Sequence, residues 1–167
     1  SQQVVRLDFE TENECLNEET EQKLLDAVKR ALPEVDIVVI SDYGKGVCND
    51  TVCQQVISAS ARQGKKVIID PKGTNWEKYR SATIITPNLK ELSAVSGVDV
   101  RNEDKEIHSA ADRILKEYNL TSLLVTRSEK GMSYIAPDAS QDIPTEAREV
   151  YDVSGAGDTV VATLAAA

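Results

Sequence analysis

Apolar side chains along the chain follow two spacings, one typical of strands and the other of helices. Residues 4–12 alternate between apolar and polar side chains, which predicts a strand with one buried face. Between residues 18 and 32 the apolar positions instead recur every three or four residues, which predicts an amphipathic helix. Pro33 cannot continue that helix, so we expect it to end there.

The two spacings keep alternating along the rest of the chain. Residues 36–41 are apolar at nearly every position, as strands buried on both faces of a parallel sheet are. Asn49 or Asp50 can cap the helix that follows, and Gly64 can end it. Further strands are expected at 66–70, 83–86, 122–126, 131–136 and 147–153, and further helices at 49–63, 88–97, 104–118 and from Gly155 onward.

This order of elements predicts the fold class. Strands that alternate with helices indicate a doubly wound, mostly parallel α/β sheet with helices on both faces. Residues 131–136 are expected to begin an antiparallel pair. No internal repeat, low-complexity tract or linker interrupts the sequence, so its 167 residues suit one domain.

Composition narrows the range of partners. Hydrophobic residues make up 41% of the chain and charged residues 28%, which is typical of a folded, soluble protein. The net charge of −9 argues against binding to nucleic acid or to an anionic membrane, since both need a basic surface. No apolar run approaches the roughly 18 residues of a membrane span, and the first residues do not resemble a signal peptide.

Three cysteines and a single histidine limit the metal chemistry of the chain. Cys48 and Cys53 are not spaced as zinc ligands are, and His108 alone rules out most Cys/His metal sites. Together with Cys15 they make an odd number, which suits reduced thiols better than a disulfide framework. We therefore expect a cytoplasmic protein in which all three cysteines are ordinary thiols.

Polar loops follow five of the expected strands. Their sequences are SDYGKG, DPKGTN, TPNLKE, TRSEKG and DVSGAGD, all rich in Gly, Lys, Asp, Asn or Thr. In open α/β sheets, ligands bind beyond the carboxyl ends of the strands. Together the five loops predict a polar cleft at that edge of the sheet.

The sequence GAGD opens the last expected helix and carries the most chemistry. The first N–H groups of a helix have no intrahelical partner and lie at its positive end, so Gly155, Ala156 and Gly157 predict an anion hole. Asp158 lies within reach of an anion held there. It is either a catalytic carboxylate or a first-turn carboxylate that the helix dipole favours. The sequence matches neither a Walker loop nor a dinucleotide fingerprint.

The sequence NLKE places Asn88 and Glu91 three residues apart at the start of another expected helix. Their side chains then point to one side, where they could hold a hydrated Mg²⁺. The alternative is a capping box, in which each side chain bonds to the backbone of the other residue. The spacing alone favours the capping box.

Together these motifs resemble those of the ribokinase-like, or PfkB, carbohydrate kinases. DVSGAGDTVVATLAAA resembles the C-terminal signature of that family, and TPNLKEL resembles its N-x-x-E motif. Within the family, RLDFE, SDYGKG, IDPKGTNWEKYR, LLVTRSEKGMS and EVYDVSGAGDT are most similar to the branch that phosphorylates D-glycero-β-D-manno-heptose 7-phosphate. The resemblance covers essentially all 167 residues.

The resemblance implies the reaction and its catalytic residues. The expected activity is ATP-dependent phosphorylation of the C1 hydroxyl of heptose 7-phosphate, in the synthesis of ADP-heptose for the lipopolysaccharide core. Asp158 would take the proton from that hydroxyl, while the backbone of 155–157 would hold the γ-phosphate. Asn88 and Glu91 would organise Mg²⁺ and the ATP phosphates, with the metal contacted through water.

The remaining implied contacts concern the nucleotide. The resemblance places one group of residues along ATP and its phosphates: Asn88, Leu89, Lys90 and Glu91. It places a second group in the strand-end loop that lines the nucleotide site: Thr126, Ser128 and Gly131. Lys45 and Lys72 are further candidates for phosphate contacts. The implied ligands are therefore Mg²⁺·ATP and heptose 7-phosphate.

The resemblance also implies a domain organisation. Residues 1–12 would be the last strand of the family's lid, and 13–167 the central and nucleotide-binding part of one kinase domain truncated at both ends. The sugar pocket would then lie outside the chain, so we expect the fragment alone to be inactive. The full-length protein would be a homodimer through the lid, in many bacteria fused to an adenylyltransferase. Two alternatives remain: a kinase for another sugar phosphate, or a non-catalytic nucleotide-binding α/β fragment.

Overall fold

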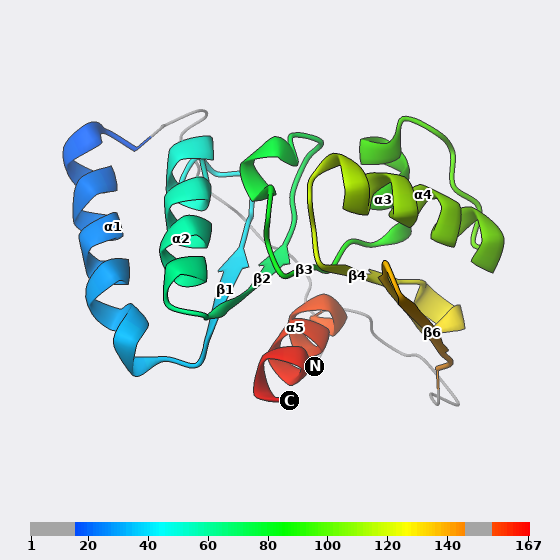
Figure 1. Ribbon diagram of the computed structural model, residues 1–167. Helices are drawn as coiled ribbons and strands as arrows, with labels where there is room; N and C mark the ends of the chain where they lie inside the picture. The colour runs from blue at the N-terminus through cyan, green and yellow to red at the C-terminus, as the bar shows by residue number, and fades with distance from the viewer. Residues whose placement is uncertain (1–15, 146–154) are drawn as a thin grey trace, which may run out of the picture.

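Among the residues that the structure describes, six strands form one sheet in the order in which they occur along the chain (Figure 1). The computed structural model describes residues 16–145 and 155–167. In this part of the chain β1 to β4 are parallel, whereas β5 and β6 run antiparallel to their neighbours. The strands are β1 (Ile37–Ser41), β2 (Lys66–Asp70), β3 (Ile84–Ile85), β4 (Ser122–Thr126), β5 (Met132–Ala136) and β6 (Ala139–Ile143).

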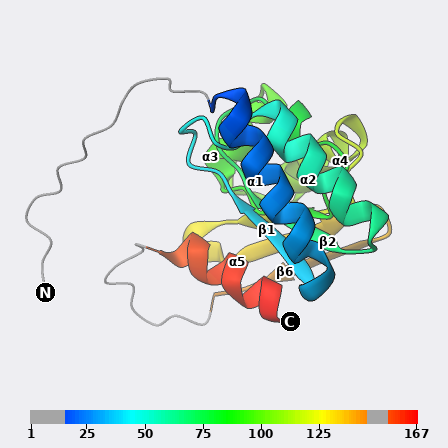
Figure 2. The same ribbon diagram turned by 90° about the vertical axis from the view of Figure 1, so that its left-hand side faces the viewer.

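Helices cover both faces of this sheet, which confirms the predicted α/β class. The described helices are α1 (Glu18–Ala31), α2 (Asp50–Arg62), α3 (Leu89–Ser96), α4 (Asp104–Glu117) and α5 (Ala156–Ala166). The first four lie on one face and α5 on the other, as Figures 1 and 2 show. Because the described strands follow chain order, the helices that connect them share one face, and α5 supplies the second layer.

Side-chain caps fix where the helices begin. Asn49 accepts a hydrogen bond from the Val52 N–H at 2.8 Å, so Asn49 rather than Asp50 caps α2. Gly97 ends α3 in the left-handed conformation, with φ 70°, which glycine adopts without steric cost. The predicted helices 18–32, 49–63, 88–97 and 104–118 are therefore confirmed to within about two residues.

The core lies between the sheet and the layer formed by α1 to α4. Ile69, Ile85 and Leu123 from neighbouring strands are fully buried, and so is Ile107 of α4. Trp76 is also fully buried, although it lies in the connection between β2 and β3. Each such side chain contributes roughly 1.5–3 kcal/mol by leaving water. This core holds the strand ends that carry the polar loops.

The prediction for 36–41 was wrong in one respect. The segment forms β1, but Val39 is 42% exposed rather than buried. Among the described strands β1 is at the edge of the sheet and pairs with β2 alone. Val38 and Ile40 point to the opposite face and pack into the core. Burial on both faces needs a second packed element, which the strand's own composition does not specify.

Two predicted strands cannot be compared with the structure. Residues 4–12 lie outside the described part of the chain, and so does the predicted strand at 147–153. Among the described residues, no helix combines the length and the apolar character needed to cross a membrane.

Candidate active site

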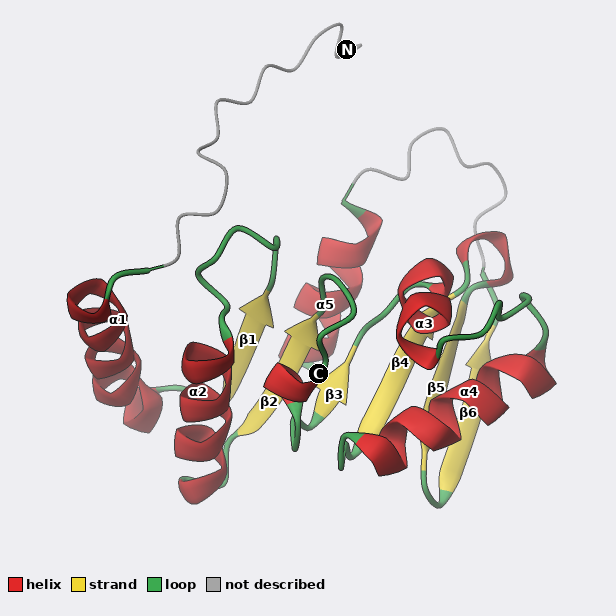
Figure 3. Cartoon of the chain, turned by 90° about the horizontal axis from the view of Figure 1, so that it is seen from above, coloured by secondary structure: helices red, strands yellow, loops and turns green. Residues whose placement is uncertain are grey.

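A cleft of about 310 Å³ lies at the carboxyl ends of β1 and β2. Figure 3 shows these strand ends on the same side of the molecule as the start of α5. Four segments of the described part of the chain line the cleft: Asp42 and Tyr43 after β1, Asp70, Pro71 and Lys72 around the end of β2, Glu91 in α3, and Gly155, Gly157 and Asp158 at the start of α5. The fold thus brings together residues from four of the five loops that the sequence predicted.

The start of α5 is the helix N-terminus at which the sequence predicted an anion hole. Gly155 has a φ of 76°, a left-handed conformation that favours glycine, and it carries no side chain to cap the helix. At the start of the helix the Thr159 N–H donates a hydrogen bond to the Gly155 carbonyl at 2.9 Å. The earlier N–H groups precede the intrahelical ladder and can bind an anion. Asp158 is exposed on this first turn.

A buried carboxylate supports the opposite wall of the cleft. Asp42 accepts hydrogen bonds from Lys78 Nζ at 2.5 Å, from the Tyr79 hydroxyl at 2.6 Å and from the Gly44 N–H at 2.6 Å. Burial alone would raise the pKa of Asp42, but these bonds outweigh it and hold the pKa below its usual value. Asp42 is therefore ionised and fixed, with its donors supplied by the protein itself.

The neighbouring carboxylate, Asp70, is in the opposite situation. Burial raises the pKa of Asp70, and the negative charges of Glu91 and Asp158 raise it further. The three carboxylates therefore repel one another across the cleft. Such a surplus of negative charge suits a divalent cation, and hydrated Mg²⁺ needs only one or two carboxylates beside phosphate oxygens. Among the described residues no group of three or more His, Cys, Asp or Glu side chains could hold a metal by itself.

Asn88 and Glu91 form the capping box that the spacing favoured. Asn88 Oδ1 accepts from the Glu91 N–H at 2.9 Å, and Glu91 Oε2 accepts from the Asn88 N–H at 3.0 Å. Glu91 also lines the cleft, so its carboxylate both caps α3 and adds negative charge to the site. Asn88 and its exposed neighbour Lys90 are not among the described residues that line the cleft, and Leu89 packs against the core. A metal role for Asn88 and Glu91 stays a prediction.

The predicted nucleotide loop follows β4. Its first residue, Thr126, donates its N–H to the Pro87 carbonyl at 2.9 Å, which places the loop beside the start of α3. Ser128 has a positive φ of 55°. Gly131 is tightly enclosed, because a Cβ there would lie 2.0 Å from the Ile143 carbonyl oxygen. The backbone of residues 143–145 passes so close to Gly131 that only glycine fits there. The presence of glycine at this position therefore needs no bound ligand to explain it.

Arg127 holds this loop from within. Its guanidinium is buried and donates to Asn102 Oδ1 at 2.9 Å and to Ser133 Oγ at 2.9 Å. It also forms ion pairs with Asp104 at 2.7 Å and Asp142 at 3.2 Å. One side chain thus links the loop to the start of α4 and to both antiparallel strands.

The two lysines singled out in the sequence occupy different places. Lys72 lines the cleft, and its N–H donates to the Tyr79 hydroxyl at 3.2 Å. Lys45 is exposed in the loop after β1 and is not among the described residues that line the cleft. The structure therefore brings Lys72, but not Lys45, to the site.

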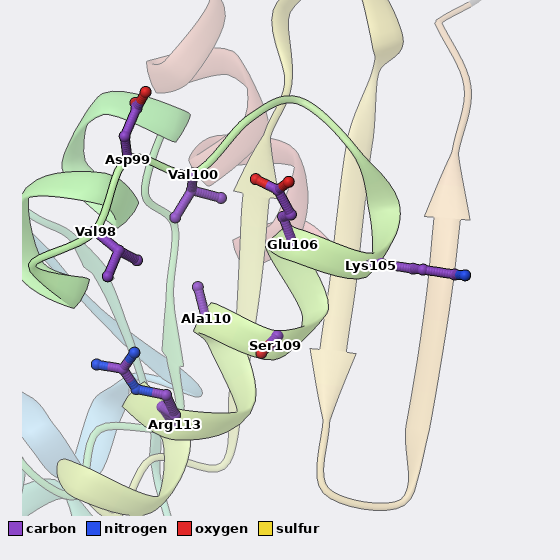
Figure 4. A pocket seen from close by; sticks show the side chains of 8 residues that line it. All are labelled: Val98, Asp99, Val100, Lys105, Glu106, Ser109, Ala110 and Arg113. Carbon is purple, nitrogen blue, oxygen red and sulfur yellow. The ribbon is translucent and has the colours of Figure 1, made fainter.

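A second hollow, of about 340 Å³, lies between the α3–α4 connection and α4 (Figure 4). Its lining includes Val98, Lys105 and Arg113. None of the site residues predicted from the sequence lines it. Predicted site residues instead line the cleft at the strand ends, among them Asp158, Glu91 and Lys72.

Three residues of the site were not singled out from the sequence. Asp42 and Asp70 come directly after β1 or end β2, so their place at a strand terminus was the available signal. Arg127 lies within the predicted loop TRSEKG, but its partners come from other elements, which no local pattern reveals.

Comparison with known proteins places this geometry in a family. The model of the pfkB family carbohydrate kinases matches residues 8–167. The chain is 48% identical over 168 aligned positions to the bifunctional protein HldE of Actinobacillus succinogenes, covering 99% of the chain and 34% of that protein. It is 46% identical to the protein of the same name from Mesorhizobium japonicum, covering 100% and 33%. The chain thus spans about a third of these relatives.

Solved structures show the same fold. Phosphofructokinase-2 from Escherichia coli, in complex with potassium, superposes with a TM-score of 0.76 at 24% identity, covering 91% of this chain and 50% of that one. Ribokinase from Arabidopsis thaliana, complexed with ribose and ATP, gives a TM-score of 0.70 at 24% identity, covering 92% and 46%. Together with the match to the family model, these relatives show that the chain belongs to the pfkB family of carbohydrate kinases.

Proposed function

We propose that the chain is the phosphate- and base-bearing part of a kinase domain that transfers the γ-phosphoryl group of ATP to the C1 hydroxyl of D-glycero-D-manno-heptose 7-phosphate. Membership of the pfkB family supports sugar phosphorylation. The motifs shared with the heptose phosphate branch support this acceptor, and the name of the relatives supports a longer, bifunctional protein. The product would be the 1,7-bisphosphate, used in ADP-heptose synthesis.

The observation that carries the proposal is the position of Asp158. It lies on the first turn of α5 and faces the same cleft as Glu91 and Lys72. In the proposed reaction Asp158 accepts the hydroxyl proton while the sugar oxygen attacks phosphorus and ADP leaves. The N–H groups at the start of α5 offset charge on the transferring group. The transition state of such reactions is loose, so positioning and charge neutralisation matter more than early proton abstraction.

The acidic side chains of the cleft fit Mg²⁺. Glu91 would contact it through water, beside Asp70, whose raised pKa already reflects crowded negative charge. Bound there, Mg²⁺ neutralises charge on the ATP phosphates. Lys72 lines the cleft and would contact a phosphate, and the loop with Thr126 and Ser128 would border the nucleotide.

The test is Asp158→Asn in the full-length protein. Loss of a general base lowers turnover by about 10²–10⁴-fold, so we expect kcat to fall at least about 10²-fold with little change in the KM for ATP. Glu18→Gln is the matched control, because Glu18 is a first-turn carboxylate of α1 and is not among the described residues that line the cleft. Near-normal turnover of the Asp158 variant would rule out its role as the base.

The acceptor needs a separate measurement. ADP release is compared with heptose 7-phosphate, fructose 1-phosphate and tagatose 6-phosphate as acceptors. We expect heptose 7-phosphate to give the highest kcat/KM. Faster turnover with either other sugar would assign the chain to another branch of the family.

A further inference from the structure

Cys48 and Cys53 lie at the two positions of a helix start whose side chains meet. Asn49 caps α2, so Cys48 is the residue before the cap and Cys53 is the fourth residue of the helix. Apolar side chains at these positions commonly pack together as a hydrophobic staple. Both cysteines are free thiols, and Cys48 packs against the core cluster that contains Cys53. In this chain both residues of the hydrophobic staple are cysteines.

The two thiols differ in access and in acidity. Cys48 is half-buried, whereas Cys53 is fully buried. A hydrogen bond with Cys53 lowers the pKa of Cys48 below that of an ordinary thiol, despite its burial. The same bond and burial raise the pKa of Cys53. Cys48 is thus the accessible thiol with the greater thiolate fraction, and Cys53 is its buried neighbour.

The pair is also linked to the wall of the cleft. Lys78 Nζ donates to the Cys48 carbonyl at 3.1 Å and to Asp42 at 2.5 Å. Asp42 in turn lines the cleft. A covalent change at Cys48 therefore occurs at one end of the loop 42–49, whose other end carries Asp42.

We propose that Cys48 and Cys53 are a redox-active pair, in which a peroxide oxidises Cys48 and Cys53 then closes a reversible disulfide. The Cys48 sulfur attacks one peroxide oxygen, the O–O bond breaks, and one water leaves after proton transfer. The Cys53 sulfur attacks the resulting Cys48 sulfenic acid, the S–S bond forms, the S–O bond breaks, and a second water leaves with the Cys53 proton. Two thiols are oxidised and hydrogen peroxide is reduced to two waters. A dithiol reductant reverses the disulfide by exchange.

Peptide mapping of the full-length protein tests the proposal directly. Trypsin leaves both cysteines in one peptide, 46–62, and Cys15 in another, 7–23. After treatment with hydrogen peroxide we expect peptide 46–62 to resist alkylation and to be lighter by two hydrogens. Dithiothreitol should restore alkylation at both positions. Alkylation of both cysteines after peroxide, or a link between peptides 46–62 and 7–23, would overturn the proposal.

Single variants separate the roles of the two thiols. In Cys53→Ala we expect the Cys48 sulfenic acid to persist and to be trapped by dimedone, because the resolving thiol is absent. In Cys48→Ser, Cys53 should stay unmodified, and Cys15→Ser should behave as the wild type. Oxidation of Cys53 in Cys48→Ser would contradict the assignment. In the untreated protein, iodoacetamide should label Cys48 at least about tenfold faster than Cys53, and equal rates would also contradict it.

Discussion

Two loops at the carboxyl edge of the sheet are each held by one buried charge, but of opposite sign. After β1, Asp42 accepts from a lysine, a tyrosine and a backbone N–H. After β4, Arg127 donates to asparagine, serine and two aspartates. The side chains of Asp42 and Lys78 are 2% and 13% exposed, whereas the aspartate partners of Arg127 are 64% and 42% exposed. Both loops are thus held by a buried charged side chain, but the contribution of each ion pair to stability depends on how far its partner is exposed to water.

Removing the cation from the more buried anchor should have the largest effect on stability. Lys78→Met leaves the Asp42 carboxylate buried without its ion pair, and such a loss costs about 3–5 kcal/mol. We expect this fall in the free energy of unfolding, measured by urea denaturation. The double variant Asp42→Asn with Lys78→Met should recover part of it, since neither charge then remains. Additive losses would show that the two residues stabilise the loop independently.

The more exposed anchor should be less costly to break. In Arg127→Met the two aspartates can be hydrated, so we expect a loss of about 1.5–3 kcal/mol, set mainly by the hydrogen bonds that half-buried Asn102 and buried Ser133 lose. Arg101→Met is the matched control, because Arg101 pairs with Glu106 on the surface, and its denaturation curve should nearly overlay that of the wild type. A loss as large as that of Lys78→Met would remove the contrast between the loops.

The smallest effect concerns the pH dependence of Asp42 and Asp70. The pKa of Asp42 is lowered, so its contribution is present above the ordinary carboxyl pKa and is lost as pH falls through the lowered value. The pKa of Asp70 is raised, so ionised Asp70 destabilises the fold as pH rises from its ordinary value through the raised one. Asp70→Asn should therefore raise the melting temperature at neutral pH, and the gain should vanish below about pH 4. A higher melting temperature of the Asp70→Asn variant that persists below about pH 4 would contradict a raised pKa of Asp70.

Much of the fold was predictable because its signals are local. Asn49, Asn88 and Gly97 mark helix ends by their own side-chain or backbone chemistry, and the structure confirms each. The exposure of Val39 was not predictable, because it depends on which element packs beside β1.

The candidate site was predictable in part for the same reason. The motif at Asp158 predicted a carboxylate beside an anion hole, and the fold brings this carboxylate to a cleft. The ion pair of Asp42 joins residues from separate loops, and the charge that surrounds Asp70 comes from α3 and α5. These partners come together only when the chain folds, so the sequence around Asp42 or Asp70 does not predict the shift of its pKa.

The position of α5 has a consequence for the order of folding. The described strands pair with their neighbours in the sequence, so the sheet can assemble from contacts between consecutive strands. Helix α5 instead contacts β1 and β2 from the far end of the chain. Long loop closure slows the formation of such contacts. We therefore expect the cleft to be completed late, after the sheet has formed. A folding intermediate would then contain the loops held by Asp42 and Arg127 but would lack the side of the cleft that carries Asp158.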